Sequence, residues 1–162
     1  MKTKIRFEDT REHRFSIGTP TTEDPTLVVC PKCNEMAKIL LSQSQPELGY
    51  AVKVICNTCG YTKEKETTHR SFDWYGEDPT DSFFGFSLWL KTSCCGHSLW
   101  AFNIRHLDLL QNYVSAELRE RKQDENGCKN SSIASRLPAW IKSSKNRKKL
   151  STALIKLRGT VK

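Results

Sequence analysis

Two short stretches, CPKC (Cys30–Cys33) and CNTCG (Cys56–Gly60), decide how the first half of this chain folds. Each holds two cysteines with two residues between them, and 22 residues separate the pairs. This spacing lets both sulfurs of one tight turn reach a single ion, and two such turns complete a tetrahedron of thiolates. Gly60 supplies the left-handed backbone freedom that such a turn often needs. The four cysteines therefore predict a structural Zn²⁺ site.

The rest of the composition favours metal binding over disulfide bonding. The chain has 162 residues, 37% of them hydrophobic, and its seven cysteines are an odd number that suits a disulfide framework poorly. Its first residues lack the apolar core of a secretory signal, so we expect a cytoplasmic protein whose thiols stay reduced. No helix is predicted after either cysteine pair, which disfavours thioredoxin-like redox motifs. No stretch approaches the ~20 consecutive apolar residues of a membrane span.

Residues of high β propensity surround both cysteine pairs. LVVCPKC (27–33) enters the first pair as a strand, and EMAKILLS (35–42) returns from it. YAVKVIC (50–56) and YTKEKET (61–67) flank the second pair in the same way. The segment SQSQPELG (42–49) between the hairpins is predicted to be a loop because it is rich in Ser, Gln, Pro and Gly.

This order of hairpins and cysteine pairs resembles the zinc-ribbon family over about residues 27–67. The resemblance implies one Zn²⁺ in a closed shell of four thiolates, which leaves no position for substrate. Zinc would then supply folding free energy on the order of 10 kcal/mol, and no zinc catalysis is expected. The stretch FFGFSLWLKTSCCGHSLWAFNIRHLDLL (83–110) is similar to small bacterial zinc-ribbon proteins of unassigned role. That similarity implies a bacterial cytosolic setting and no particular activity.

The second half predicts a third hairpin and several helices. FSLWLKTS (86–93) and SLWAFN (98–103) are apolar, aromatic strand candidates. Asn103 can cap a helix over about 104–122, whose apolar residues recur at helical spacing. A short helix is predicted over 132–137, and the last helix ends near Arg158, with Gly159 as its stop.

Together these patterns predict an α+β fold: a zinc ribbon of antiparallel hairpins, a further aromatic β-hairpin, and helices in the C-terminal half. We divide the chain into four segments on this basis. They are a polar N-terminal arm (1–26) with one short strand near 5–7, the zinc ribbon (27–68), a hairpin with an amphipathic helix (69–125), and a basic helical segment (126–162).

The sequence CCGH (94–97) places three metal-capable side chains, Cys94, Cys95 and His97, within four positions. One interpretation is a second metal site, completed by His69, His106 or Cys128, and another is a thiol activated by histidine. We favour a hairpin turn with Gly96 at its tip and buried thiols beside it. Adjacent residues of a strand point to opposite faces, and free cysteine is among the most often buried residue types.

Two further features each allow a functional and a structural interpretation. The aromatic residues of the third hairpin could form a stacking platform for bases, or they could pack under the predicted 104–122 helix, which we favour. The acidic segment SFDWYGEDPTDSFFG (71–85) could bind a basic partner or contact the chain's own basic end, or it is an ordinary solvated loop, which we favour. The aromatic residues are Phe83, Phe84, Phe86, Trp89, Trp100 and Phe102.

Positive charge is concentrated at the C-terminal end. The net charge is +8, but the segment 129–162 holds ten Lys or Arg and no acid, which leaves 16 basic and 18 acidic residues elsewhere. This polarity indicates a polyanionic partner, and contacts to phosphate need Lys and Arg without any base-reading chemistry. The residues predicted to bind nucleic acid are Lys142, Lys145, Arg147, Lys148, Lys149, Lys156 and Arg158.

The start of the last helix matters for this prediction, and two starts stay open. If Ser144 is the N-cap, four cations crowd the first turn, where the helix dipole disfavours them unless an anion binds. If the helix starts at Pro138, the same cations lie in its middle.

The predicted function is a non-enzymatic accessory protein that binds RNA or DNA through this basic segment. The alternative is a protein–protein adaptor subunit of a larger assembly, which would use the ribbon and the acidic aromatic loop. An enzyme built around Cys95 and His97 is a third hypothesis, but no carboxylate pair, phosphate loop or nucleophile motif supports it. We expect no small-molecule substrate, and a membrane partner is disfavoured because the last helix has few apolar residues.

Overall fold

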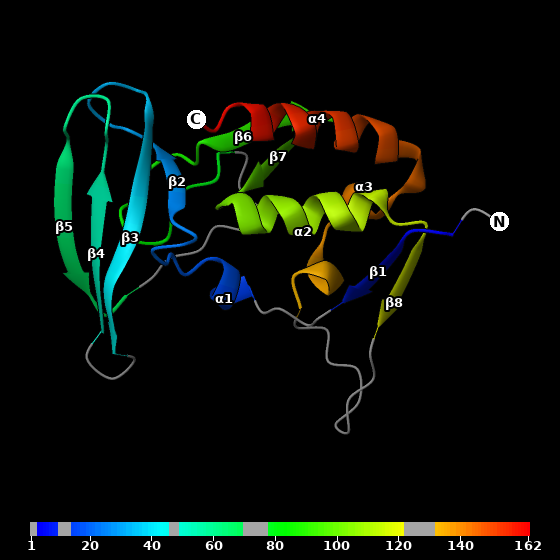
Figure 1. Ribbon diagram of the computed structural model, residues 1–162, viewed down its shortest axis with the longest axis horizontal. Coiled ribbons are helices and arrows are strands. Elements are labelled where there is room, and N and C mark those ends of the chain that lie inside the picture. Colours follow the sequence, from blue (N-terminus) through cyan, green and yellow to red (C-terminus); the bar gives the residue numbers. More distant parts are fainter. Residues whose placement is uncertain (1–2, 10–13, 46–48, 70–77, 122–131) are drawn as a thin grey trace.

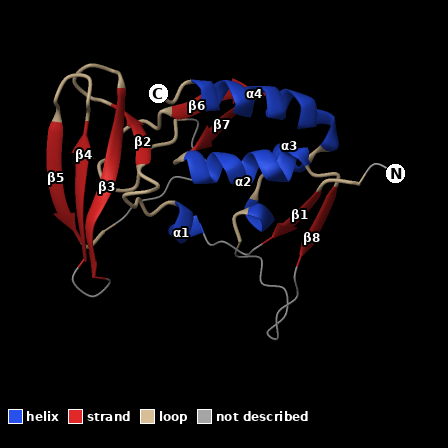
Figure 2. Cartoon of the chain, in the orientation of Figure 1, coloured by secondary structure: helices blue, strands red, loops and turns tan. Residues whose placement is uncertain are grey.

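The computed structural model describes residues 3–9, 14–45, 49–69, 78–121 and 132–162 (Figure 1). It confirms the predicted α+β fold class, with antiparallel hairpins, an aromatic hairpin and helices in the C-terminal half (Figure 2). In chain order the elements are β1 (Arg6–Asp9), α1 (Arg14–Ile17), β2 (Thr26–Val29), β3 (Met36–Gln45), β4 (Gly49–Ile55), β5 (Thr62–Thr67), β6 (Leu90–Cys94), β7 (His97–Ala101), α2 (Ile104–Ser115), β8 (Leu118–Arg121), a 3-10 turn (Ala134–Arg136), α3 (Ala139–Lys142), a 3-10 turn (Ser144–Asn146) and α4 (Arg147–Gly159).

The cysteine half is a four-stranded antiparallel sheet in the order β2-β3-β4-β5. Strand β3 is longer than predicted, because Gln43–Gln45 continue the ladder opposite β4 where a loop was expected. A β-bulge between Leu41 and Gln43 absorbs the change of register. The prediction failed there because ladder hydrogen bonds satisfy the backbone of polar residues as well as that of apolar ones. The middle of the predicted loop lies outside the described residues.

Strand β2 joins the two halves of the molecule. Its far edge pairs with the segment before β6: the Val29 N–H donates to the Ser87 carbonyl at 2.8 Å, and the Trp89 N–H donates to the Leu27 carbonyl at 3.0 Å. Leu27 is buried in the core of the helical half, whereas its neighbour Val28 is buried in the core of the cysteine half. Because strand side chains alternate between faces, one short strand contributes to both cores.

The helical half packs α2 and α4 against the β6–β7 hairpin (Figure 1). Leu107 and Leu110 of α2 meet Leu150 and Leu154 of α4 in its core, and all four are at most 2% exposed. Leu157 of α4 is buried in the same core, so the three leucines of α4 share one apolar face. The aromatic residues Phe83 and Phe102 are buried in the core of the cysteine half, and Phe102 also contacts His106 of α2.

The predicted 104–122 helix is too long. Helix α2 ends at Ser115, Ala116 has an extended backbone, and Leu118–Arg121 form β8, which pairs in parallel with β1. The Arg119 guanidinium lies 4.0 Å from the Tyr113 ring centroid and donates to the Lys142 carbonyl, which holds this chain reversal in place. Figure 1 shows β1 and β8 at the end of the molecule far from the four-stranded sheet.

Candidate metal centre and basic groove

The two Cys-x-x-Cys stretches form turns of the same design. In the first turn, the Cys30 N–H donates to the Glu35 carbonyl at 2.8 Å, and the Cys30 carbonyl accepts from the Asn34 N–H at 3.0 Å. In the second turn, the Cys56 carbonyl accepts from the Gly60 N–H at 3.0 Å. Asn34 and Gly60 occupy equivalent positions and both have a left-handed backbone, with φ of 61° and 74°. This role was predicted for Gly60 and not for Asn34, although asparagine tolerates the left-handed conformation better than most residues.

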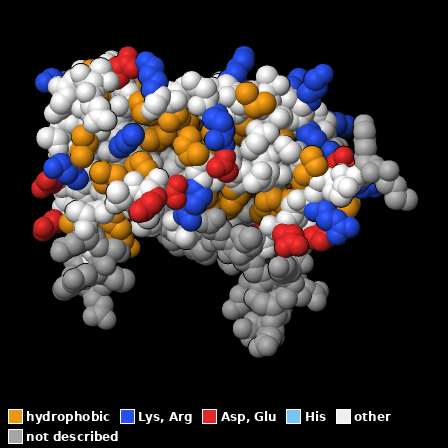
Figure 3. Space-filling view, in the orientation of Figure 1, with side chains coloured by type: hydrophobic (Ala, Val, Ile, Leu, Met, Phe, Trp, Pro, Cys, Tyr) orange, Lys and Arg blue, Asp and Glu red, His pale blue; other side chains and the backbone are white. Residues whose placement is uncertain are grey.

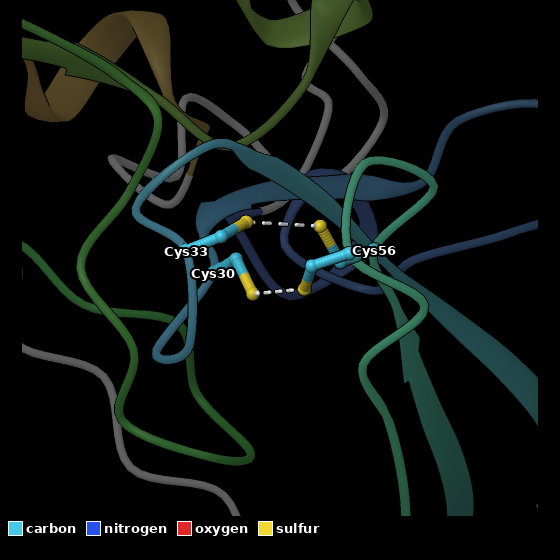
Figure 4. A group of neighbouring side chains, drawn as sticks. Cys30, Cys33 and Cys56 are labelled. Carbon is cyan, nitrogen blue, oxygen red and sulfur yellow. Dashed lines mark hydrogen bonds between the residues drawn. The ribbon is translucent and has the colours of Figure 1, made fainter.

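The strands bring the four sulfurs together. The Sγ atoms of Cys30, Cys33, Cys56 and Cys59 all lie within 4.8 Å of one another. The Cys30–Cys59 and Cys33–Cys56 sulfurs are 3.7 and 3.6 Å apart, and Figure 4 shows the labelled side chains converging from the two turns. Zn–S bonds of about 2.3 Å in a tetrahedron put sulfurs about 3.8 Å apart, whereas a disulfide needs about 2.05 Å. The spacing thus suits a shared metal ion.

The surroundings of the sulfurs shift the pKa values of Cys33 and Cys56 in opposite directions. The Cys59 backbone N–H and, less strongly, that of Thr58 lower the pKa of Cys56 to about 7. The Glu35 N–H lowers the pKa of Cys33, but burial and the other three thiols outweigh it and raise that pKa to about 12. Four neighbouring thiolates repel one another, so a bound dication is what allows all of them to be ionised.

The centre is a part of the core, because Cys30 and Cys56 are fully buried among Val28, Ile39 and Val54. Cys33 and Cys59 are half-buried, which leaves one side of the cluster near the surface. If all four thiols bind one ion, no coordination position is left for a reactant. The arrangement is suited to holding the two turns together and not to catalysis at the metal.

The structure does not bring Cys94, Cys95 and His97 together in the way that it does the four cysteines. Among the described residues, the four-cysteine cluster is the only group of three or more potential ligands close enough to share an ion. Cys94 and Cys95 lie side by side, with 3.4 Å between their sulfurs, but His97 is exposed and stacks on Trp140, with 4.7 Å between ring centroids. His106 is buried elsewhere, and its Nδ1 accepts the Phe102 N–H. Cys128, the other ligand considered, lies outside the described residues.

The acidic segment holds a structural carboxylate that sequence analysis missed. Asp81 is 2% exposed, and its carboxylate accepts the backbone N–H groups of Phe83, Phe84 and Phe86 at 2.6–2.8 Å. The interpretation as an ordinary solvated loop is therefore wrong for Asp81. An aspartate that organises the five residues after it leaves little signal in sequence, because the same residue type is common in solvated loops.

The last helix starts at neither of the two positions considered from the sequence. Pro138 precedes the one-turn helix α3, Ser144 begins a 3-10 turn, and α4 starts at Arg147 with Asn146 before it. Arg147, Lys148 and Lys149 therefore occupy the first turn of α4, where a cation is disfavoured by the helix dipole.

The predicted basic residues are not equivalent in the structure. Arg158 pairs with Asp108, and the Lys142 ammonium donates to the Ser135 carbonyl at 2.9 Å, so both serve the fold. Four exposed lysines have no acidic partner in the part of the chain that the structure describes: Lys145, Lys148, Lys149 and Lys156. Figure 3 shows basic side chains along the edge of the molecule where α4 lies.

Three of these lysines face a groove between β6 and α4 of about 460 Å³. Its α4 side is lined by Lys148, Lys149, Thr152, Ala153 and Lys156, and its β6 side by Thr92, Ser93, Cys94 and Cys95. The sequence predicts the lysines but not the groove, because the two sides of the groove are more than fifty residues apart in the chain.

None of the described helices combines the length and the apolar character required to cross a bilayer. The four cysteines are placed to hold a metal ion. The chain matches no protein-family model, no curated protein and no solved structure, so these side chains are the basis for assigning a function.

Proposed function

We propose that the chain is a zinc-ribbon protein whose four cysteines bind one structural Zn²⁺ and whose basic C-terminal segment binds the phosphate backbone of RNA or DNA. The observation that carries the second part is the groove between β6 and α4. Three exposed lysines, Lys148, Lys149 and Lys156, face it together with the hydroxyl-bearing residues Thr92 and Thr152. Ammonium and hydroxyl groups are the donors that proteins direct at phosphate oxygens.

The zinc supports this function indirectly. Cys30, Cys33, Cys56 and Cys59 would hold the ion, which lowers the free energy of the folded chain by an amount on the order of 10 kcal/mol. Strand β2 runs from the first cysteine turn to the core beneath β6, so the sheet that the ion stabilises also supports one side of the groove.

The charge distribution favours a polyanion over a small anion. The segment 129–162 holds ten cations and no acid, whereas the rest of the chain is close to neutral. Lysines are hydrated point charges on flexible stems, which suit phosphates without discriminating between sequences. We therefore propose binding to the backbone and not to particular bases.

The nucleic-acid proposal is tested by measuring affinity for a short fluorescent RNA, the same DNA single strand and the duplex over a range of salt. Log affinity should fall linearly with log salt, and Lys148→Glu with Lys149→Glu should weaken binding by about tenfold or more and flatten the slope. The matched control is Lys4→Glu with Lys63→Glu, which makes the same charge change at exposed lysines remote in sequence from α4. Equal losses in both double variants would mean that net charge acts, and not the groove.

The zinc proposal is tested by elemental analysis of the purified chain. We expect one zinc per chain, lost in Cys33→Ser and retained in Cys95→Ser. A chain that folds without stoichiometric metal would contradict it.

The adaptor alternative has weaker support. The exposed edge strand β5 has the sequence TKEKET, and alternating charges on an edge oppose pairing with another strand. In the acidic aromatic segment, Asp78 pairs with Lys91 and Asp81 is buried, so two of its four acids are used within the fold. A protein that stays bound after nuclease treatment would favour the adaptor.

A further inference from the structure

The β6–β7 turn has a cysteine at a position that the turn itself does not favour. Cys94 and His97 are paired across a two-residue turn, and its central residues Cys95 and Gly96 have φ of 56° and 79°. Two-residue turns of this hand favour Asn-Gly or Gly-Gly, because a Cβ at the first central position is disfavoured in the left-handed region. Turn geometry therefore explains Gly96 and gives no reason for a cysteine before it.

The turn brings two thiols into contact at a site with access to solvent. The sulfurs of Cys94 and Cys95 are 3.4 Å apart, and both residues line the groove of about 460 Å³ between β6 and α4. Cys94 is 8% exposed, while Cys95 is half-buried beside the exposed Gly96. A small reagent in the groove can therefore reach Cys95 first, with Cys94 directly behind it.

The groove is also strongly cationic. Lys148, Lys149 and Lys156 line its other side, and among the described residues they have no acidic partner. Positive charge near a sulfur favours its thiolate, which is the reactive form, and attracts anionic reagents. Lys149 acts on Cys94 in this direction, although burial and the Cys95 thiol outweigh it and raise the pKa of Cys94 to about 11.

We propose that Cys94 and Cys95 form a redox-active thiol pair, which an anionic low-molecular-weight disulfide oxidises to an internal disulfide through the lysine-lined groove.

The reaction proceeds in two balanced exchanges. The Cys95 thiol loses its proton, and its thiolate attacks one sulfur of the reagent, so that a mixed disulfide forms and one reagent thiolate leaves. Cys94 then loses its proton and attacks the Cys95 sulfur, which releases the second reagent thiolate and leaves the Cys94–Cys95 bond. The two cysteines are oxidised together and the reagent disulfide is reduced to two thiols.

The product should be readily reversible. Adjacent residues have Cα atoms about 3.8 Å apart, shorter than the usual range for bridged cysteines, and bridges that are strained or exposed are the easily reduced ones. The four-cysteine centre is chemically separate, because metal-bound thiolates are shielded and their sulfurs belong to other turns. This inference does not depend on nucleic-acid binding, because its test contains none.

The test uses the zinc-loaded full chain and three disulfides that differ in charge: glutathione disulfide, which is anionic, hydroxyethyl disulfide, which is neutral, and cystamine, which is cationic. After acid quenching, alkylation and trypsin digestion, the peptide Thr92–Arg105 contains Cys94 and Cys95 and no other cysteine. We expect this peptide to lose two hydrogens and to resist alkylation. The anionic reagent should react about tenfold faster than the neutral one, and cystamine the slowest.

Three variants assign the roles. Cys94→Ser should stop at a mixed disulfide on Cys95, and Cys95→Ser should slow the reaction of Cys94 because the more accessible of the two thiols is gone. Replacing Lys148, Lys149 and Lys156 with Gln should remove the preference for the anionic reagent, whereas the control pair Lys4→Gln and Lys63→Gln should keep it. A peptide that never gains an internal disulfide, or wild-type rates that ignore the charge of the reagent, would overturn the proposal.

Discussion

At the scale of single residues, the start of α2 shows how polar side chains are made compatible with a core. Asn103 is 1% exposed: its Oδ1 caps the helix by accepting the His106 N–H at 2.8 Å, and its Nδ2 donates to the Ile17 carbonyl. His106 is buried beside Trp100 and Phe102, and its Nδ1 accepts the Phe102 N–H. The bond from the Phe102 N–H requires a neutral imidazole, because a protonated Nδ1 cannot accept a hydrogen bond.

His106 should therefore make stability depend on pH. Burial and, less strongly, the Arg105 charge lower the pKa of His106 from 6.5 to about 3. Between these values the unfolded chain binds a proton that the folded chain does not, so stability falls as the pH drops below 6.5. From pH 7 to pH 5 the loss is about 2 kcal/mol of unfolding free energy.

The measurement compares wild type with His106→Asn by denaturant unfolding at both pH values, with zinc present. The asparagine Oδ1 can replace the Nδ1 acceptor but does not titrate. The variant should be less stable at pH 7, and its deficit should shrink at pH 5 by about 2 kcal/mol. A deficit that does not change with pH would show that His106 is protonated in the fold or is not buried.

At the scale of elements, the two cysteine turns use different residues for the same backbone conformation. Asn34 and Gly60 each have a positive φ directly after the second cysteine of a pair. A Cβ added to Gly60 meets no heavy atom within 4 Å, so the cost of a side chain there is one of backbone conformation alone.

These turns permit a matched pair of substitutions. Gly60→Ala should lower the unfolding free energy of the zinc-bound chain by about 1 kcal/mol, because alanine is disfavoured at φ of 74°. Asn34→Gly should change it by only a few tenths of a kcal/mol, since glycine adopts this conformation freely. Urea unfolding measures both. Losses of the same size in the two variants would mean that side-chain contacts matter more than the left-handed backbone.

Helix α4 offers a second matched pair. Leu154 is 1% exposed in the core between α2 and β6, whereas Ile155, one residue further, is 63% exposed. Leu154→Ala should cost about 2–5 kcal/mol, the usual range for a buried leucine, and Ile155→Ala within about 0.5 kcal/mol. Thermal and urea unfolding would show it. If both changes were mild, α4 would not be docked through this face.

At the scale of the whole molecule, two hydrophobic cores share one strand. Leu27 and Val28 of β2 belong to different cores, and the β2 backbone forms hydrogen bonds with Ser87, Trp89 and Phe102, which flank the β6–β7 hairpin. Because the same strand leads into the first cysteine turn, loss of the metal should also destabilise the core of the helical half. The predicted segment boundaries near residues 27, 69 and 126 stay a prediction, and an experiment that removes the metal tests whether the segments fold independently.

Chelation provides that experiment. A structural zinc contributes on the order of 10 kcal/mol, comparable to the whole net stability of a domain, so a strong chelator should unfold the chain. Trp89, Trp100 and Trp140 lie outside the ribbon, and their near-ultraviolet circular dichroism should disappear together with the sheet signal. Tryptophan signals that survive removal of the metal would instead show two units that fold independently.

Much of this architecture follows from local sequence. The Cys-x-x-Cys spacing, the residues of high β propensity around it, the Asn103 cap and the Gly96 turn are patterns within a few residues, and each predicted its element. The cysteines of the candidate metal centre were identified for the same reason, since two turns of defined chemistry have few ways to meet.

The tertiary structure alone decided which distant segments lie together. Leu118 fits the helical spacing of α2, yet it begins β8, because an extended chain there can pair with β1 and cover the end of the core. The lysines of α4 and the thiols of Cys94 and Cys95 meet in one groove for a similar reason. Helix α4 and strand β6 each bury an apolar face in the shared core, and that packing places the remaining side chains together. The spacing of apolar residues predicts whether a segment is a helix or a strand and which of its faces is buried. Which other element covers that face is set by the packing of the whole chain.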